Sequence, residues 1–570
     1  MIRIIHLHPV RLITLGGFAL LFAACAAPPP AHLASACAGM QGRVIGPERI
    51  ALPSGAASIE AAAWDLAAPM QSRPNGAVTP ATPDFCKLTG SIAPLDPAAP
   101  RIQFQINLPA AWNGKTLQYG GGGFNGVLIT GLAALRDAPP DLALPIAQGY
   151  ATFGTDSGHQ ASAHPPADLA AWALNDEALV NFAYASYKKV KDVTHAVTAD
   201  FYRRAPSHSY FFGGSEGGRE GLTMAQRFPA DYDGIFSAVP VINLVGLNHS
   251  FIRVQQMQAA GAWIAPEKIP ALGLGVARAC DALDGLADGV VNNYLECAKR
   301  FDPASLRCPD GRDAGNHCLS DAQVAVVKGM YSPFKFPFQL ANSIDAYPAR
   351  LPGGEDHPDG WIAWVGGRAA PAHPPAAANS RQWLYGNNAI RYLVVRDAAF
   401  DVRQYNLDNL KQHEARIRYL SSLLDSTSPD LSAFFARGGR LVIRENAGDL
   451  AQSGAAGMDY FNALVARSGR ATIDRHVRLY VSPASTHSGA ARSVTDGSEV
   501  ATAYDMLGLL DRWVTDGEAP RDALEQVAKE SAPPFRIRAT RPLCLYPGYP
   551  HYIGGDAKVA ASYRCTRSGS

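Results

Sequence analysis

Apolar and polar positions along the chain follow two periods, one typical of strands and one typical of helices. Arg101–Leu108 alternates apolar and polar side chains as a half-buried strand does, and the short runs Lys115–Tyr119 and Tyr150–Gly154 predict two further strands. Glu177–Arg204 carries apolar residues at helical spacing and predicts a long helix. Strands that alternate with helices predict an α/β fold with a mostly parallel sheet covered on both faces.

The most informative stretch is Tyr210–Gln226, in which an aromatic run leads through glycines into a helical segment. Tyr210–Phe212 predicts a buried strand, Gly213–Gly217 matches G-x-S-x-G, and good helix formers follow as far as Pro229. Ser215 would then stand at a strained turn before a helix, where free N–H groups favour a developing negative charge. Ser215 is therefore a candidate nucleophile; the alternative is a capping serine in a glycine-rich turn.

The alternation of strands and helices stops after Ile235–Pro240, which predicts another strand. Residues 243 to about 431 are rich in Pro, Gly, Ala and Trp and show no such rhythm. Strand patterns resume at Gly438–Arg444 and Leu479–Ser482, and Tyr504–Thr515 predicts a final helix. We therefore interpret the chain as one α/β domain in two parts, residues 37–242 and 431–570, separated by an inserted lid at residues 243–430.

Composition is that of a large globular enzyme. The chain has 570 residues, of which 47% are hydrophobic and 18% charged, with a formal charge of +1. This length is ample for a core and too long for one compact unit without an insertion. Near-neutral charge without a basic block gives no support to a nucleic-acid partner. No pattern indicates an oligomeric state.

The N-terminus, residues 1–36, has the features of a targeting segment. Two arginines precede the apolar run Leu12–Ala24, which is too short to span a bilayer. Phe22–Cys25 resembles a bacterial lipoprotein signal, which makes Cys25 a possible lipid anchor. The alternative is ordinary cleavage further on, for example at Ala34–Ala36. Both interpretations predict an exported protein, in the periplasm, on the outer membrane or secreted.

Export changes how the nine cysteines are interpreted. Without Cys25, eight remain, an even number in an oxidising compartment, and no C-x-x-C pair supports a zinc or redox site. Neighbours in sequence suggest one pairing among the 105 that eight cysteines allow. The suggested pairs are Cys37–Cys86, Cys280–Cys297, Cys308–Cys318 and Cys544–Cys565.

A nucleophilic serine needs a base and a group that orients the base, and in α/β-hydrolases the chain order is Ser, Asp or Glu, then His. Asp449 follows the strand LVIREN, and His487 follows the strand that ends at Ser482, so both lie just past strand ends. The alternative for His487 is a solvated loop histidine. Competing residues nearby are Asp459, Asp474 and His476.

A glycine loop, Gly120–Gly126, follows the strand Lys115–Tyr119. Such a loop can hold phosphates, yet no Lys-Ser/Thr follows it and no G-x-G-x-x-G with a ribose-binding acid is present. In a serine hydrolase a glycine loop after an early strand supplies an oxyanion N–H instead. We expect that second role.

Several motifs together resemble the tannase and feruloyl esterase family, from about Cys37 to Cys565. They are CKLTG, PAAWNG, GGGGFNG, TDSGH, GGSEGGRE, FPADYDGI and CDALDGLADGV. The resemblance implies an α/β-hydrolase with a large lid, acting on small aromatic esters of the feruloyl, galloyl or terephthalate monoester type. It places the nucleophile, orienting acid and base at Ser215, Asp449 and His487. It places the oxyanion donors at the backbone N–H groups of Glu216 and of Gly122 or Gly123.

One departure from that family is plain. Its members usually carry a cysteine just before the serine and another just after the histidine, joined by a disulfide. Here those places hold Gly214 and Ser488. Because both cysteines are missing together, we expect the catalytic groups to keep their roles. A contact other than the disulfide must then hold His487.

The segment Cys280–Val290 brings three aspartates within eight residues. Their carboxylates repel one another unless a hard cation or solvent compensates, and their spacing differs from that of an EF-hand. The family resemblance implies a structural calcium site in the lid, and the alternative is a solvated acidic turn. The implied ligands are the side chains of Asp281, Asp284 and Asp288 and the carbonyls of Leu286 and Val290.

The leading hypothesis is an exported serine esterase that works through an acyl-enzyme. A surface lipoprotein that binds a ligand on the same fold without turnover is the alternative, and only the family resemblance argues against a peptidase. The residues that select the aromatic acid are expected in the lid, where the sequence shows no regular pattern of strands and helices.

Overall fold

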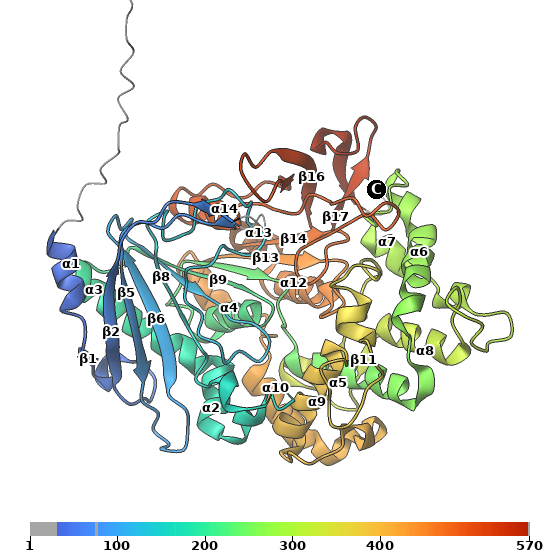
Figure 1. Ribbon diagram of the computed structural model, residues 1–570, viewed down its shortest axis with the longest axis horizontal. Helices are drawn as coiled ribbons and strands as arrows, with labels where there is room; N and C mark the ends of the chain where they lie inside the picture. The colour runs from blue at the N-terminus through green and yellow to red at the C-terminus, as the bar shows by residue number, and fades with distance from the viewer. Residues whose placement is uncertain (1–30, 74–77, 166, 568–570) are drawn as a thin grey trace, which may run out of the picture.

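The computed structural model describes residues 31–73, 78–165 and 167–567, with one twelve-stranded sheet through its centre (Figure 1). Six neighbouring strands at the centre of this sheet are parallel, and they include the predicted strands that flank the candidate site. In spatial order they are β8 (Ala151–Thr155), β7 (Lys115–Tyr119), β9 (His208–Gly214), β10 (Gly234–Ala238), β13 (Arg440–Asn446) and β14 (Val477–Ser482).

Helices cover both faces of the parallel strands, as predicted. Along β9, Phe211 packs on the face covered by α4 (Glu216–Arg227), while Tyr210 and Phe212 pack on the face covered by α14 (Met506–Thr515). This alternation is the period of two expected of a strand buried on both sides. The long helix predicted at 177–204 is present as α2 (Asp176–Val180), a π turn and α3 (Ser186–Tyr202).

The prediction of a mostly parallel sheet is wrong, because the other six strands join the sheet by antiparallel pairing. The final helix predicted at Tyr504–Thr515 is confirmed as α14, the last α-helix in the described chain, and four strands follow it. Several of these strands are rich in Ala, Lys, Arg and Glu, which favour strands weakly, so neighbouring strands and not local propensity determine them. The six antiparallel strands flank the parallel ones. On the side of β8 they are β6 (Ile102–Pro109), β5 (Phe85–Ile92), β2 (Ala57–Asp65) and β1 (Val44–Ile45), and on the side of β14 they are β16 (Ile537–Leu545) and β15 (Ala523–Lys529). A separate hairpin of β17 (Gly548–Tyr552) and β18 (Tyr563–Arg567) ends the described chain.

Between β10 and β13, the described chain contributes no strand to the large sheet and forms a mainly helical region. Its helices lie along the bottom and right of Figure 1, away from the β1–β2 edge. Two apolar cores fill it, one around Trp383 and one around Trp361, and the first also takes in Phe124 and Phe182 of the α/β domain. The principal helices are α5 (Leu244–Met257), α6 (Ile269–Cys280), α8 (Asp321–Met330), α9 (Arg381–Asn388) and α10 (Glu414–Leu424).

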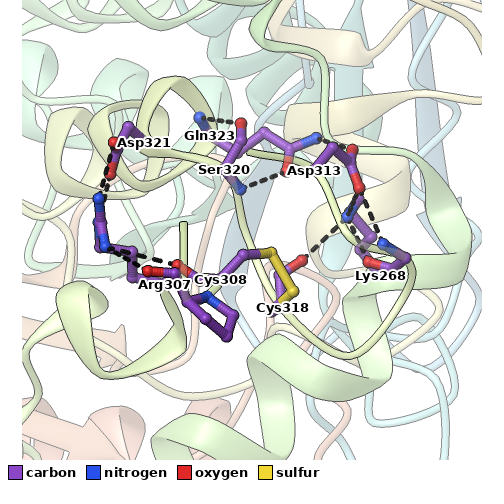
Figure 2. The surroundings of a disulfide bond; sticks show 10 residues. Lys268, Arg307, Cys308, Asp313, Cys318, Ser320, Asp321 and Gln323 are labelled. Atoms are coloured by element: carbon purple, nitrogen blue, oxygen red, sulfur yellow. Dashed lines mark hydrogen bonds and ion pairs between the residues drawn. A yellow bond between two sulfur atoms is a disulfide. The ribbon is translucent and has the colours of Figure 1, made fainter. Parts of the chain in front are cut away.

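All four suggested disulfides are present. Figure 2 shows the surroundings of Cys308–Cys318, a surface loop of the lid. The ammonium of Lys268 reaches into this loop and donates to Asp313 Oδ1 at 2.9 Å and to the carbonyl of Cys318 at 2.9 Å. The disulfide and the buried lysine together hold the loop against the start of α6.

The N-terminal predictions fall largely outside the described residues. The apolar run and Cys25 lie within residues 1–30, whose structure is not described. The alternative cleavage place lies in α1 (Ala31–Ala38), and Cys37 of that helix is bonded to Cys86. In the described chain, no helix is both long enough and apolar enough to cross a membrane.

Candidate active site

The chain turns sharply at Ser215, between β9 and α4. Ser215 has φ 60° and ψ −122°, a backbone conformation that costs an L-residue about 1–3 kcal/mol. The turn leaves no room for side chains on either side, because a Cβ at Gly213 would lie 2.2 Å from the carbonyl oxygen of Gly217. The predicted strand, tight turn and helix are confirmed, and they hold the serine at the end of the central sheet.

The side chains of Ser215, His487 and Asp449 form one hydrogen-bonded chain. His487 Nε2 lies 2.9 Å from Ser215 Oγ, and His487 Nδ1 lies 2.7 Å from Asp449 Oδ2. When Nδ1 carries the proton and donates to the carboxylate, Nε2 accepts from the serine hydroxyl. This is the geometry that general-base activation of a serine requires.

Asp449 is fully buried and held by backbone donors. Its Oδ1 accepts from the N–H groups of Ala451 at 2.8 Å and Gln452 at 3.1 Å, which leaves Oδ2 directed to His487. Asn446, the last residue of β13, donates from its side chain to the carbonyl of Thr486 at 2.7 Å. The last residue of β13, just before the turn at residues 447–453 (the acid turn), is thus bonded to the loop after β14, residues 483–490 (the base loop).

The competing residues lie elsewhere. Asp459 lies within α12 (Gly454–Ser468), and Asp474 pairs with Arg470 on α13 (Arg470–His476). His476 bonds through Nδ1 to the carbonyl of Gly439 and stacks on Phe435. None of the three is bonded to Ser215 in the described structure.

Two backbone N–H groups remain available for an oxyanion. The N–H of Gly122 donates to Asn125 Oδ1 at 2.6 Å, so it is already bonded. Those of Gly123 and Glu216 have no acceptor among the described residues, and both residues line the cavity that also holds Ser215. Because, among the described residues, the N–H of Gly122 is already bonded and that of Gly123 is not, Gly123 is favoured over Gly122 as the second oxyanion donor.

A buried carboxylate on α4 holds the glycine loop. Glu220 Oε2 accepts from the N–H of Gly121 at 3.0 Å, and Oε1 accepts from the side-chain amide of Asn125 at 2.8 Å. That amide also reaches the hydroxyl of Tyr187 at 2.9 Å. Burial raises the pKa of Glu220, while the hydrogen bonds from Asn125 and Gly121 oppose the rise. The loop is thereby fixed to the same helix whose first turn follows Ser215.

A cavity of about 280 Å³ opens above these groups. It is lined mainly by apolar and aromatic side chains of the α/β domain and the lid, with Ser215 and His487 exposed to it. Arg381 is the only lysine or arginine among its lining residues, and its guanidinium lies 5.0 Å from the centre of the Trp364 ring. The apolar wall includes Phe124, Leu244, Phe251, Trp364 and Tyr385.

Other contacts lie at Gly214 and beside Ser488, the places of the missing cysteines. A Cβ at Gly214 would lie 2.7 Å from Cδ of Arg136, so the stem of that arginine lies against the residue before the nucleophile. A Cβ at Gly489 would lie 2.0 Å from Oδ1 of Asp137. Asp137 in turn approaches the buried guanidinium of Arg444 at 3.4 Å. Non-covalent packing therefore connects the nucleophile turn with the base loop.

The acidic loop of the lid offers oxygen donors whose type suits calcium. Asp281 accepts from the N–H groups of Asp288 and Gly289, and Asp288 Oδ2 pairs with Arg541 at 2.9 Å. Burial raises the pKa of Asp284 to about 7, and a bound cation would favour its ionised form. In the part of the chain described, no three His, Cys, Asp or Glu side chains are gathered as a metal site. The calcium site stays a prediction.

Sequence reasoning missed Asn125, Glu220, Arg136 and Arg381. Asn125 stands in the glycine loop with φ 58°, and an asparagine among glycines is a signal for a left-handed position. Nothing in the sequence marks Arg136 or Arg381, because their roles depend on segments that are distant in the chain.

The comparisons with known proteins agree with this geometry. A family model described as tannase and feruloyl esterase matches residues 86–566. An uncharacterized esterase of Agrobacterium fabrum is 33% identical over 545 residues, which cover 94% of each chain. Mono(2-hydroxyethyl) terephthalate hydrolase of Piscinibacter sakaiensis is 32% identical over 568 residues, which cover 90% of this chain and 89% of that one.

Solved structures show the same fold. The crystal structure of feruloyl esterase B from Aspergillus oryzae has a TM-score of 0.73 at 21% identity and covers 94% of this chain and 100% of its own. The predicted α/β-hydrolase fold is confirmed. The family match and the names of the relatives establish the reaction class as carboxylic ester hydrolysis. The chain belongs to the tannase and feruloyl esterase family and is a carboxylic ester hydrolase.

Proposed function

We propose that the protein is an exported serine esterase that hydrolyses esters of aromatic carboxylic acids through an acyl-enzyme. One observation carries this proposal: the hydrogen-bonded chain from Ser215 through His487 to Asp449 opens into a cavity with aromatic walls. A planar aromatic acyl group suits such a wall, because aromatic pairs gain from stacked and edge-to-face contacts.

The geometry supports the following reaction. Ser215 Oγ attacks the ester carbonyl carbon while His487 Nε2 takes its proton, and Asp449 stabilises the imidazolium that forms. The oxyanion accepts hydrogen bonds from the N–H groups of Gly123 and Glu216. Collapse breaks the bond to the alcohol oxygen, which His487 protonates. Water, deprotonated by His487, then attacks the acyl carbon. The bond to Ser215 Oγ breaks, His487 returns the proton to that oxygen, and the acid is released.

Arg381 favours a substrate that carries a carboxylate in addition to the ester. Its guanidinium adjoins the cavity over Trp364 and keeps donors beyond the one bonded to Asp359, so it can pair with a distal carboxylate. One relative is named as a hydrolase of mono(2-hydroxyethyl) terephthalate, a monoester of an aromatic dicarboxylic acid. Other relatives are named feruloyl esterases. We place a terephthalate monoester ahead of feruloyl and galloyl esters.

Export is part of the proposal. It rests on the apolar run before Cys25 and on the four disulfides, which persist in oxidising compartments. Calcium in the lid is proposed as a structural ion only. When bound, it would neutralise the repulsion of the acidic loop.

A panel of methyl and hydroxyethyl esters of terephthalic, ferulic and gallic acids tests the function. We expect turnover of aromatic esters with a burst of alcohol, and the highest kcat/KM with the terephthalate monoester. Peptide anilides serve as the comparison for a peptidase. Absence of a burst with activated aryl esters would favour the ligand-binding alternative, and preference for anilides would favour the peptidase.

A further inference from the structure

The lid segment 351–360 lies against both the acid turn and the base loop. A Cβ at Gly354 would lie 2.8 Å from the carbonyl oxygen of Gly448 and 3.1 Å from Cγ2 of Thr486. Gly448 precedes Asp449, and Thr486 precedes His487. The backbone of the lid therefore packs directly on the residues that carry the acid and the base.

At the end of this segment, the side chain of Asp359 is bonded to three partners. Its Oδ2 accepts from the backbone N–H of Ser488 at 2.8 Å. Its Oδ1 accepts from Trp364 Nε1 at 3.1 Å and from Arg381 Nη1 at 3.1 Å. Trp364 and Arg381 line the cavity, whereas Asp359 stands behind them.

These partners connect two functions of the site. Ser488 is the residue after His487, and the Trp364 ring meets the imidazole edge to face, with centres 5.0 Å apart. The imidazole is thus held through the N–H of its neighbour and by the ring beside it. Both contacts depend on one carboxylate of the lid.

We propose that Asp359 is a positioning residue that fixes the base loop relative to the part of the cavity wall formed by Trp364 and Arg381. Its side chain bonds to Ser488, the neighbour of His487, and also to Trp364 and Arg381, which line the cavity that would hold the acyl group. Because the two anchoring cysteines of the family are absent here, this lid contact is one of the bonds that set the place of the imidazole. The inference rests on the proposed function and deepens it.

Asp356 provides a matched control on the same segment. It pairs with Arg492 at 3.3 Å, and its side chain is 19% exposed, against 20% for Asp359. Asp356 makes no bond to the residues beside His487 in the described structure. A general loosening of the lid would affect both positions alike, whereas positioning of the base affects only Asp359.

The test measures labelling of Ser215 by a small neutral fluorophosphonate, because this reagent needs the base and fills little of the cavity. We expect Asp359→Ala to lower the second-order labelling rate about 10- to 100-fold, the range that a misplacement of about 1 Å produces. Asp359→Asn keeps one acceptor and should lose less. Asp356→Asn should label within twofold of the wild type.

Thermal unfolding of all variants accompanies the rates and identifies folded protein. Folded Asp359→Ala and Asp359→Asn that both label as fast as the wild type would overturn the inference and leave the proposed function intact. A loss in Asp356→Asn as large as that in Asp359→Ala would also overturn it. A wild-type protein that is not labelled at Ser215 would overturn the inference together with the proposed function.

Discussion

On the oxyanion side of Ser215, Glu220 and Asn125 bond the glycine loop to helix α4. On the base side, His487 stands on a loop that is contacted by the lid through Asp359 and by Asp137. The first arrangement lies within the α/β domain and joins the glycine loop after β7 to the helix after β9. The second depends on segments from three distant parts of the chain. The lid also touches the glycine loop, because a Cβ at Gly123 would lie 2.6 Å from the hydroxyl of Tyr385 and the ring of Phe124 packs on that of Tyr385. The hydrogen bonds that hold the glycine loop nevertheless lie within the α/β domain, whereas a hydrogen bond that holds the base loop comes from the lid.

The largest effect should come from the orienting acid. Asp449→Asn keeps the volume and one acceptor but favours the wrong tautomer of His487, so we expect kcat to fall about 10⁴-fold. Steady-state kinetics with the best ester of the panel measure it. A loss below about tenfold would mean that Asp449 does not orient the base.

A smaller effect is expected on the oxyanion side. Glu220→Gln replaces one acceptor with an amide donor that faces the N–H of Gly121 or the amide of Asn125. The glycine loop should shift and kcat should fall by up to about 10²-fold, the lower end of the loss of an oxyanion donor. KM should change little. Because Glu220 and Asp359 share no hydrogen-bond partner in the described structure, Asp359→Ala combined with Glu220→Gln should show additive losses.

An additive double variant would confirm that the two sides are supported independently. Strong non-additivity between Glu220 and Asp359 would contradict the comparison. The measurement is a double-mutant cycle on the labelling rate of Ser215, with Asp356→Asn in place of the Asp359 variant as its control.

Calcium removal should act on stability and leave the chemistry nearly unchanged. The acidic loop adjoins the chain beyond the base loop, because Val494 donates to the carbonyl of Gly289 at 3.0 Å. An ion at 100 times its dissociation constant stabilises the folded state by about 2.7 kcal/mol, so chelation should lower Tm by a few degrees. The Asp284→Asn/Asp288→Asn variant should lose this response and still be labelled at Ser215. An unchanged melting curve in chelator would mean that the loop is solvated.

The smallest effect is expected from restoring a covalent link. We expect the Cα atoms of Gly214 and Ser488 to lie within the roughly 4.4–6.8 Å that a disulfide spans, so that Gly214→Cys/Ser488→Cys oxidises. Chain entropy allows a gain of up to about 4–5 kcal/mol, but the new Cβ meets the stem of Arg136 at 2.7 Å. A modest rise in Tm with activity retained is therefore expected. Two titratable thiols in the folded, oxidised variant would show that residues 214 and 488 are too far apart to form a disulfide.

The comparison of the two sides also explains what the sequence could predict. The turn at Ser215 and the glycine loop are local patterns, since glycines are required where a Cβ would meet a backbone atom. Asp449 and His487 could be found from chain order and strand ends. The antiparallel strands β2, β15 and β16 could not, because their weakly strand-forming sequences are determined by their neighbours.

The contacts on the base side are the part that no local pattern encodes. Asp359, Arg136 and Asp137 are ordinary loop residues in the sequence, and only the folded chain places them beside the nucleophile turn and the base loop. The bond from Glu220 to the glycine loop likewise joins residues about 100 positions apart. Such long-range contacts become visible only in the folded chain.

The most direct test of the central claim is peptide mapping of the protein after reaction with a fluorophosphonate. The account predicts one modified residue, Ser215, in the peptide that contains Gly213–Gly217, and complete loss of labelling in Ser215→Ala. That variant should also lose about 10⁴- to 10⁶-fold in kcat on aromatic esters. Labelling at another serine, or turnover by Ser215→Ala at the wild-type rate, would contradict the proposed mechanism.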